Sequence, residues 1–263
     1  MTGTTEPLNS VALRAGCRIG TFDGPTSGHA LGSVQANMVI LPAEFAAEFR
    51  DFCDKNPKPC PILEIHQPGD PEPKLIAPGA DVRTDLPRYR VFRDGQVVDE
   101  PTDISDLWRD DLVTFMLGCS FIAEEALMAA GLMLPHIAET GFVPMYRTTR
   151  ETVPVGRFAG PIVVSMRPFT PEEAEQAAEI TAHYPMAHGA PIHIGDPDAL
   201  GIRDIDAPEF GRAVTIAPGR ITAFWACGVT PQEALAAAEP PLAITHAPGQ
   251  MFVADITAES TRI

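Results

Sequence analysis

The stretch SVQANMVILP, residues 33–42, decides the fold of this chain. Val34 and the run from Met38 to Leu41 are apolar, which is typical of a mostly buried strand, and Pro42 ends it. The next stretch, AEFAAEFRDFCDKN, carries three phenylalanines at helical spacing and predicts an amphipathic helix. This buried strand followed by a one-sided helix indicates a sheet with helices packed on its faces.

Similar patterns extend in both directions from this strand. The sequence predicts a short helix at residues 10–20, a hairpin that turns at Asp94-Gly95, and a helix after Thr170-Pro171. Residues 103–131 are predicted as helical, with a break at GCS, residues 118–120. Because strands and helices alternate, the predicted class is α/β, a mixed sheet with helices on its faces plus a smaller α+β domain.

The order of the elements also suggests how the chain is divided. Residues 141–214 carry their own strand–helix–strand unit and are predicted to form an inserted smaller α+β domain. Residues 1–140 and 215–263 are predicted to form the main α/β domain. The last fifty or so residues look like a strand, a helix and a strand that complete the sheet begun by residues 33–42.

Composition excludes several classes of function. The 263 residues carry a formal charge of −16, which argues against binding to nucleic acids or to an anionic membrane surface. The five cysteines form no Cys-x-x-Cys pair, and the first ten residues lack a signal pattern. The longest apolar stretch is broken by Glu124 and Glu125, so no membrane span is expected. We therefore expect a cytoplasmic protein.

The GCS bend at residues 118–120 is the first candidate for chemistry. Cys119 and Ser120 would lie at the start of a helix, where unpaired backbone N–H groups hold an anion or a developing oxyanion. A thiol in that position is acidified. In the alternative interpretation, Ser120 only caps the helix and Cys119 belongs to the core.

A second candidate is HGAPIHIGDP, residues 188–197. His193 and Asp196 are close enough in sequence to act as a general base and its orienting carboxylate. With His188 they could also ligate a divalent metal, although the spacing matches no established metal motif. In the simpler interpretation, Asp196 caps the short helix that follows and the histidines are structural.

The third candidate is WACGVTPQEALAAAEPPLAITHAPG, residues 225–249. Cys227 would end one strand, Thr230 would start a helix, and Thr245 and His246 would end the next strand. If the two strands are neighbours, the thiol and the imidazole converge beside a helix N-terminus, at the sheet edge where open α/β proteins bind ligands. The alternative is a core cysteine and a surface histidine.

An acidic protein that handles a carboxylate needs a local guanidinium group. Arg83 and Arg147 are the preferred candidates because each lies in a turn-rich context, and Arg167, after a buried strand, is the third.

Taken together, these motifs resemble one family over essentially the whole chain. They are similar to the D-glutamate cyclase family, whose bacterial members are often labelled hydro-lyases. The stretches that carry the resemblance are, in this order, QANMVILP, NPKPCP, DVRTDLPRYRV, DDLVTFMLGCSF, VPMYRT, GPIVVSMRP, HGAPIHIGDP, FWACGVTPQ and THAPGQMF. The resemblance implies an α/β fold with a second α+β domain. It also implies conversion of D-glutamate to 5-oxo-D-proline with loss of water. The chain departs from the family pattern at Ile122-Ala123 and at Gln250, where histidine is more usual and where glutamine cannot take a proton.

If the chain cyclises D-glutamate, we expect these residues to have the following roles. Arg83 or Arg147 would bind the α-carboxylate, and backbone N–H groups at Cys119-Ser120 or Thr230 would receive the oxyanion. His246 or His193 would be the base, and Glu124 or Cys227 the acid. The residues Asn37, Thr245 and Asp196 complete the predicted substrate contacts.

No cofactor is required for this reaction. The expected partner is a small-molecule carboxylate, and neither a nucleic acid nor a membrane is expected to bind. The sequence does not decide whether the protein forms a homodimer. Two alternatives are a dehydratase that acts on another small carboxylic acid with a divalent metal, and a non-catalytic protein that binds a small acid.

Overall fold

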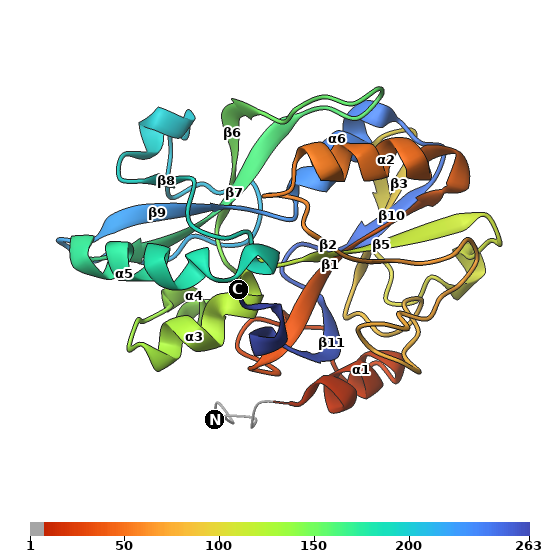
Figure 1. The fold of residues 1–263 in the computed structure, drawn as a ribbon, viewed down its shortest axis with the longest axis horizontal. Coiled ribbons are helices and arrows are strands. Elements are labelled where there is room, and N and C mark those ends of the chain that lie inside the picture. The colour runs from red at the N-terminus through yellow and green to blue at the C-terminus, as the bar shows by residue number, and fades with distance from the viewer. Residues whose placement is uncertain (1–7) are drawn as a thin grey trace.

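The computed structural model of the chain describes residues 8–263 and places two β-sheets beside each other, with helices packed around them (Figure 1). The larger sheet has the strand order β2-β5-β1-β10-β3-β4, and β11 also pairs with β1. The smaller sheet has the order β6-β7-β9-β8. Most of the N-terminal stretch that lacks a signal pattern, residues 1–7, lies outside the described residues.

The elements have the following bounds. The larger sheet contains β1 (Ser33–Pro42), β2 (Ile62–Ile65), β3 (Tyr89–Arg93), β4 (Gln96–Asp99), β5 (Leu112–Gly118), β10 (Ala243–His246) and β11 (Phe252–Thr257). The smaller sheet contains β6 (Met145–Glu151), β7 (Pro161–Phe169), β8 (His193–Ile194) and β9 (Ile221–Ala226). The helices are α1 (Ser10–Arg18), α2 (Ala43–Lys55), α3 (Glu124–Ala129), α4 (Pro135–Glu139), α5 (Pro171–Ala182) and α6 (Thr230–Ala238). Short 3-10 turns are η1 (Ser105–Leu107), η2 (Ser120–Ala123), η3 (Pro185–Ala187), η4 (Pro197–Leu200) and η5 (Ala258–Thr261).

Strand β1 lies at the centre of the larger sheet and is buried from Val34 to Pro42, as its apolar sequence predicts. One edge of β1 pairs with β5 from Ala36 to Pro42. The opposite edge is shared by two strands, because β10 pairs at Val39 and Ile40 while β11 pairs from Ala36 back to Ser33. The edge of β1 therefore opens between β10 and β11 at residues 37 and 38.

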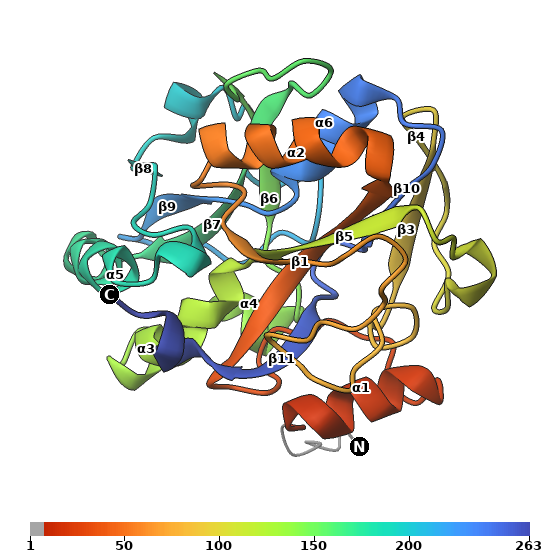
Figure 2. The same cartoon turned by 45° about the vertical axis from the view of Figure 1, so that its right-hand side comes forward.

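Helices α2 and α6 lie together over one face of this sheet (Figures 1 and 2). The helix predicted after residue 42 is confirmed. Its Phe45, Phe49 and Phe52 pack with Phe115 of β5 and Leu235 of α6. Burying each phenylalanine fully contributes roughly 1.5–3 kcal/mol, so this aromatic layer holds α2 firmly on the sheet.

Helix α5 covers the smaller sheet. The predicted cap is confirmed, since Thr170 and Glu173 form a reciprocal capping box with Pro171 in the first turn. Thr181, near the end of α5, accepts a hydrogen bond of 3.1 Å from the indole nitrogen of Trp225 on β9. The helix and the sheet are thus joined by a buried polar contact as well as by apolar packing.

The α/β class is confirmed, but the helix predicted across residues 103–131 is wrong in its central part. Residues Leu112–Gly118 form the buried strand β5, and η2 with α3 begins only after the GCS bend. All seven residues of this run are buried, and it has no alternation of apolar and polar residues that would distinguish a strand from a buried helix.

The predicted completion of the larger sheet is correct for β10 and wrong for β9. Strand β9 pairs with β7 and β8 in the smaller sheet, and the chain crosses between the sheets at Cys227-Gly228-Val229. All named strand pairs in residues 8–263 are antiparallel, so the rule that ligands bind at the carboxyl edge of parallel strands does not locate a site here. The division into residues 1–140, 141–214 and 215–263 stays a prediction.

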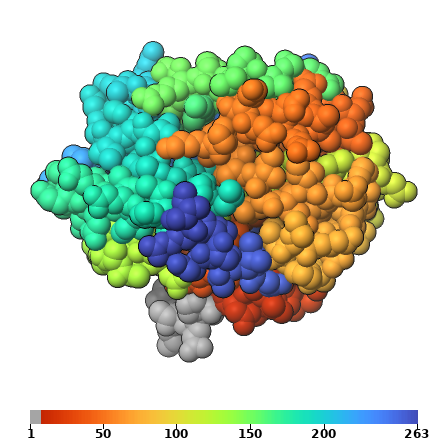
Figure 3. Space-filling view, in the orientation of Figure 1, coloured from red at the N-terminus to blue at the C-terminus, as the bar shows by residue number. Residues whose placement is uncertain are grey.

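The C-terminal residues lie across the junction of the two halves on the face seen in Figure 3, where the dark blue segment separates green from orange. The Ile263 amide donates to the His183 carbonyl at 3.0 Å, and the Tyr184 hydroxyl donates to Glu259 at 3.3 Å. These contacts join the end of the chain to α5 and η3. None of the helices in residues 8–263 combines the length and the apolar character needed to span a membrane.

Candidate active site

Gly118 and Gly228 meet over β1 at Asn37. The Asn37 amide donates a hydrogen bond to the Gly118 carbonyl, and a Cβ atom placed on Gly228 would lie only 1.9 Å from the Asn37 amide nitrogen. Cys119 and Cys227, which follow and precede these glycines, belong to one buried cluster with Met145 and Met251. We call Asn37, Gly118, Cys119, Cys227 and Gly228 the glycine junction. It joins the ends of β5 and β9, one from each sheet.

The environment of the two thiols corrects one expectation. Burial raises the pKa of Cys119 far above its ordinary value and raises the pKa of Cys227 from 9.0 to about 11. The Cys227 thiol faces the Met145 thioether at 3.4 Å. The prediction of an acidified thiol at the start of a helix is therefore wrong, because the low-dielectric surroundings outweigh the backbone N–H groups.

His246 fills the opening at the edge of β1. Its Nδ1 atom lies 3.1 Å from the backbone N–H of Met38 and 3.4 Å from the carbonyl oxygen of the same residue. Its own carbonyl accepts bonds from Gln232 and Thr245 at 3.1 and 3.0 Å. Burial, together with the charge of Arg90, lowers the pKa of His246 from 6.5 to about 4, so the imidazole is neutral at pH 7. His246 is thus a buried, uncharged group next to the glycine junction in the sheet.

A second group of polar side chains, the ion cluster, ties α3, α4 and β7 together. Glu124 Oε1 lies 2.7 Å from His136 Nε2 and 3.3 Å from Arg167 Nη2, and Glu124 Oε2 accepts a bond of 2.9 Å from Ser27. Arg167 Nη2 also lies 3.2 Å from the Ser120 hydroxyl. All of these side chains are buried. The ion cluster adjoins the glycine junction because Ser120 directly follows Cys119.

The charge states within the ion cluster follow from its contacts. Burial opposes ionisation of Glu124, but His136, Arg167 and Ser27 outweigh it and hold the pKa of Glu124 below its ordinary value. Burial also lowers the pKa of His136, against the pull of Glu124. Glu124 is therefore a carboxylate paired with the Arg167 guanidinium, and His136 is neutral and donates from Nε2. A carboxylate in this state does not fit the predicted role of acid.

A surface cavity of about 310 Å³ lies beside these residues. Arg90, Arg212 and Gln250 line it together with Phe142 and Phe210, and we call these five residues the arginine pocket. The carboxylates of Glu100 and Glu209 also line the cavity, so its two guanidinium groups are matched by two carboxylates. Phe210 also packs against the apolar cluster that holds Cys119 and Cys227. Ala247, directly after His246, is another lining residue. The pocket is thus the solvent-facing side of the junction between the sheets.

The two guanidinium groups of the arginine pocket differ in their partners. Arg90 pairs with Glu100 at 2.8 Å and donates to Gln232 at 3.3 Å, which links it to the His246 carbonyl. Arg212 lies over the Phe142 ring at 5.4 Å, and within residues 8–263 it makes no ion pair. An exposed guanidinium without a carboxylate partner, held over an aromatic ring, is suited to bind a carboxylate ligand.

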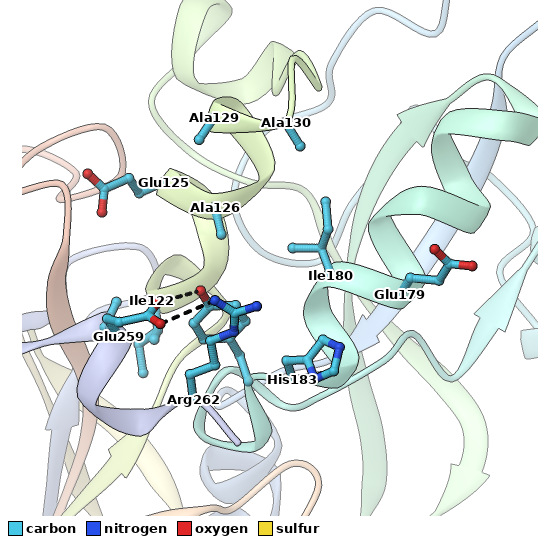
Figure 4. Close-up of a pocket in the computed structure, with 12 residues that line it drawn as sticks. Ile122, Glu125, Ala126, Ala129, Ala130, Glu179, Ile180, His183, Glu259 and Arg262 are labelled. Carbon is cyan, nitrogen blue, oxygen red and sulfur yellow. Dashed lines mark hydrogen bonds and ion pairs between the residues drawn. The ribbon is translucent and has the colours of Figure 1, made fainter.

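A larger hollow, of about 600 Å³, lies between α3, α5 and the C-terminal segment (Figure 4). Ala126 and Ile180 line it, Glu125 and Glu179 stand at its sides, and Arg262 is paired with Glu259 at 3.2 Å. Its one guanidinium is thus already neutralised, and further carboxylates surround it. Three carboxylates and one guanidinium group line this hollow, whereas the arginine pocket has two of each, so we favour the arginine pocket for an acidic ligand.

The two arginines preferred from the sequence do not fit the predicted role of binding the substrate carboxylate. The Arg83 guanidinium donates three hydrogen bonds to the Asp81 carboxylate, of 2.9, 3.1 and 2.6 Å. Arg147 lies over Phe210 but binds both oxygens of Glu233, at 2.9 and 3.0 Å. Both guanidinium groups are occupied by carboxylates of the chain itself.

The second candidate motif is not assembled as a catalytic pair. His193 lies on β8 and contacts the backbone carbonyl of Asp196 at 2.8 Å, not its carboxylate. Asp196 caps η4, accepting from the Asp198 amide, as the simpler interpretation predicts. No group of three His, Cys, Asp or Glu side chains placed to hold a metal ion is found in the described part of the chain.

Thr230 and Thr245 serve the fold through their hydroxyl groups. The Thr230 hydroxyl accepts a bond of 3.0 Å from the Val163 amide, and its backbone N–H donates to the Cys227 carbonyl at 3.0 Å. That N–H group is therefore not available to an oxyanion in this structure. Thr245 supports His246, as described above.

Sequence reasoning missed His136, Ser27, Arg90 and Arg212. Arg90 stands in the same motif as Arg83, so the motif pointed to the right segment but not to the right guanidinium. Nothing in the pattern around His136 marks it as a partner of Glu124.

Comparisons with known proteins agree on one family. The sequence profile described as D-glutamate cyclase matches residues 113–255. A protein of Rubrobacter xylanophilus named "Putative hydro-lyase" is 57% identical over 90% of this chain and 92% of its own length. Relatives with the same description from Bordetella petrii and Bacillus licheniformis are 52% and 54% identical, over 97% and 94% of this chain and 97% and 94% of their own. A solved structure of a nitrogen repressor-like protein from Methanococcus jannaschii covers 89% of this chain and 90% of its own at 9% identity with a TM-score of 0.37, which assigns neither fold nor function.

Proposed function

The chain belongs to the D-glutamate cyclase family, and we propose from this premise that it is a hydro-lyase that converts D-glutamate to 5-oxo-D-proline with loss of water. In this reaction the amino nitrogen attacks the γ-carboxyl carbon. A C–N bond forms, a C–O bond breaks, and one oxygen leaves as water. Nothing is oxidised or reduced.

The arginine pocket carries the proposal. D-glutamate brings two carboxylates to a protein whose formal charge is −16, so it needs a site of locally opposite sign. Arg90 and Arg212 both line one cavity of about 310 Å³. Glu100 is paired with Arg90 and Glu209 also lines the cavity, which leaves Arg212 as the lining guanidinium without an ion pair among the described residues. Arg212, which is not neutralised by a carboxylate of the described chain, is the group best placed for the α-carboxylate.

Positioning supplies a large part of the expected rate. Holding the amine against the γ-carbon replaces the entropy loss of folding the free chain, an effect worth up to roughly 7–11 kcal/mol in ideal geometry. The apolar cluster beneath Phe210 excludes water from the reacting end, which strengthens every hydrogen bond made there. His246, neutral and next to the pocket residue Ala247, is the imidazole we assign to this end.

The direct test is product analysis. Purified protein is incubated with D-glutamate, and in parallel with L-glutamate, and 5-oxoproline is resolved by chiral chromatography. We expect 5-oxo-D-proline from D-glutamate and a much slower reaction of the L-isomer. Recovery of D-glutamate unchanged, together with a raised melting temperature, would support a non-catalytic binding protein instead. A rate that depends on an added divalent metal and is lost with a chelator would favour the metal-dependent dehydratase.

A further inference from the structure

Gln250 is a polar side chain of the arginine pocket that the proposed reaction has not yet used. It lines the cavity, although only 7% of the residue is exposed. Its Nε2 atom donates to the backbone carbonyls of Asp23 and Gly24, the second at 3.4 Å. Because a carbonyl oxygen only accepts hydrogen bonds, these contacts fix which end of the amide is the nitrogen. The orientation of the Gln250 amide therefore follows from its partners.

The amide oxygen of Gln250 is left without a partner. Within residues 8–263, Oε1 accepts no hydrogen bond, yet it is not one of the fully buried atoms that lack a partner. The oxygen therefore keeps some exposed surface at the cavity that its side chain lines. An amide oxygen has two lone pairs and accepts from N–H or O–H groups. Gln250 thus offers a neutral hydrogen-bond acceptor to a molecule bound in the pocket.

A tight turn holds Gln250 in this position. The backbone N–H of Gln250 donates to the Ala247 carbonyl at 2.9 Å, which closes a turn with Pro248 and Gly249 at its centre. Gly249 has a φ angle of +82°, as the second central residue of a type II turn requires. Thr26 fastens the turn, because its backbone N–H donates to the Gly249 carbonyl at 3.0 Å. The Pro-Gly pair before Gln250 therefore sets the backbone from which the side chain projects.

The ring of Phe142 connects this turn with Arg212. A Cβ atom on Gly249 would lie only 2.8 Å from the Phe142 ring, so the turn packs directly against it. The Arg212 guanidinium lies over the same ring, with its central carbon 5.4 Å from the ring centroid. Gln250 and Arg212 are therefore both held next to one aromatic side chain, and both line one cavity.

The two carboxylates of the cavity are less suited to hold a substrate amine. Glu100 is paired with Arg90 at 2.8 Å. Glu209 is exposed, and its Oε2 atom accepts from the backbone N–H of Arg147 at 3.1 Å. An acceptor that is already held in place loses less entropy on binding than a mobile exposed side chain does. Gln250, which is buried and hydrogen bonded through its nitrogen, is such an acceptor.

We propose that Gln250 Oε1 accepts a hydrogen bond from the α-amino group of the substrate while Arg212 binds its α-carboxylate. This inference rests on the proposed function and names the chemical group that the pocket selects. A neutral amine donates through an N–H bond, so its lone pair stays free to attack the γ-carbon. The role needs no proton transfer at position 250, and a glutamine can therefore fill it. The pocket then distinguishes α-amino acids from acids of equal length that lack the amine.

Two ligands that cannot cyclise isolate the contribution of the amino group. D-2-Aminopentanoate and pentanoate both lack the γ-carboxyl group, and they differ only in the amine. Their dissociation constants are measured by ligand-detected NMR at pH 7. We expect the wild type to bind D-2-aminopentanoate at least about tenfold more tightly, because a hydrogen bond that involves a charged group contributes an effect of this size. Equal affinities in the wild type would overturn the inference without the use of any variant.

Three variants locate the contact. Gln250→Met keeps the length of the side chain but removes the amide, so the preference for the amine should fall to within about twofold. Glu209→Gln and the matched control Gln176→Met, at an exposed position of α5, should keep the wild-type preference. Because both ligands bind the same folded protein, a loss of stability does not change the ratio of their dissociation constants. A preference that survives in Gln250→Met, or that is lost in Glu209→Gln instead, would overturn the assignment.

Kinetics with D-glutamate separate this contact from the reaction. We expect Gln250→Met to lower kcat/KM by about tenfold or more, because the amine is no longer held against the γ-carbon. If 5-oxo-D-proline is formed and Gln250→Met behaves like Gln176→Met, the contact is contradicted and the reaction stands. If the preference for the amine depends on Gln250 but no 5-oxoproline is formed, the proposed reaction is contradicted and the contact stands.

Discussion

The ion cluster and the imidazoles of His188 and His246 are both buried, but they differ in how their polar atoms are used. In the ion cluster both oxygens of Glu124 are hydrogen bonded, and its charge is balanced by Arg167. The Nε2 atoms of the two imidazoles have no partner among the described residues. Both regions therefore bear the cost of taking polar groups out of water, and the ion cluster recovers most of it within the protein, with Arg167 Nε as its one buried atom left without a partner among the described residues.

This difference distinguishes residues that stabilise the fold from residues that are available for catalysis. Groups that are fully satisfied hold elements together, and their removal should mainly lower stability. A buried group with an unsatisfied atom has that atom free for a ligand, and where such a group contacts substrate its removal should mainly lower activity. Every substitution below is therefore followed in two ways, by the free energy of unfolding and by the rate with D-glutamate.

The largest loss of stability is expected at Glu124. In Glu124→Ala the buried Arg167 loses its counter-charge, which should lower the free energy of unfolding by about 3–5 kcal/mol in urea titrations. The double variant Glu124→Ala/Arg167→Met removes both charges and should recover part of that loss. Glu125→Ala, at the exposed neighbouring position, serves as the control. Equal effects of Glu124→Ala and Glu125→Ala would show that the ion cluster does not support the fold.

Acid should destabilise the protein through its buried histidines. Burial lowers the pKa of both His188 and His246 from 6.5 to about 4, so the unfolded chain binds protons in this range that the folded chain does not. Their contribution is complete above pH 6.5 and declines as the pH falls, by roughly 3 kcal/mol for each histidine at pH 4. His188→Asn should reduce the slope of stability against pH by about one proton. An unchanged slope would mean that His188 is not buried as a neutral ring.

A smaller effect is expected at the glycine junction. In Gly228→Ala the new methyl group would lie 1.9 Å from the Asn37 amide nitrogen, so one of the two segments must shift. Overpacking of this kind lowers the free energy of unfolding by about 1–3 kcal/mol. Because the shift moves Asn37, kcat should fall more than the loss of stability explains. Gly219→Ala is the reference, since a Cβ there meets nothing within 4 Å, although its φ of +82° adds backbone strain of its own.

Much of the fold could be predicted from local patterns. The helices α1, α2 and α5 and the strand β1 follow from capping residues, apolar periodicity and flanking prolines. The strand β5 could not be distinguished from a helix because all of its residues are buried, and the exchange of β9 into the smaller sheet depends on pairing with β7 across distant sequence. Neither of these two features can be predicted from a short stretch of sequence.

The candidate site could be predicted only in part, because it too depends on contacts between residues that are distant in the sequence. The sequence placed Cys119, Cys227 and His246 at the ends of elements, and the structure brings Cys119 and Cys227 into one buried cluster. The strands that end at Cys227 and His246 are not neighbours, because β9 and β10 belong to different sheets, and His246 contacts Met38 of β1 instead. The sequence could not show that Arg83 and Arg147 are neutralised by Asp81 and Glu233. Nor could it show that His188 would be left with an unpaired nitrogen, because that depends on the position of the Lys58 carbonyl.

The arginine pocket offers the most direct test of the account, because it should show almost no effect on stability. Arg212→Ala removes an exposed side chain without an ion pair in the described chain, so the free energy of unfolding should change by less than about 0.5 kcal/mol. The measurement is kcat/KM for the formation of 5-oxo-D-proline by the wild type, by Arg212→Ala, and by Arg50→Ala as a charge-matched control on α2. We predict a loss of at least about tenfold for Arg212→Ala alone, because a hydrogen bond between charged groups contributes roughly 1.5–3 kcal/mol. Equal rates for all three proteins would contradict the assignment of this pocket as the place where the substrate binds.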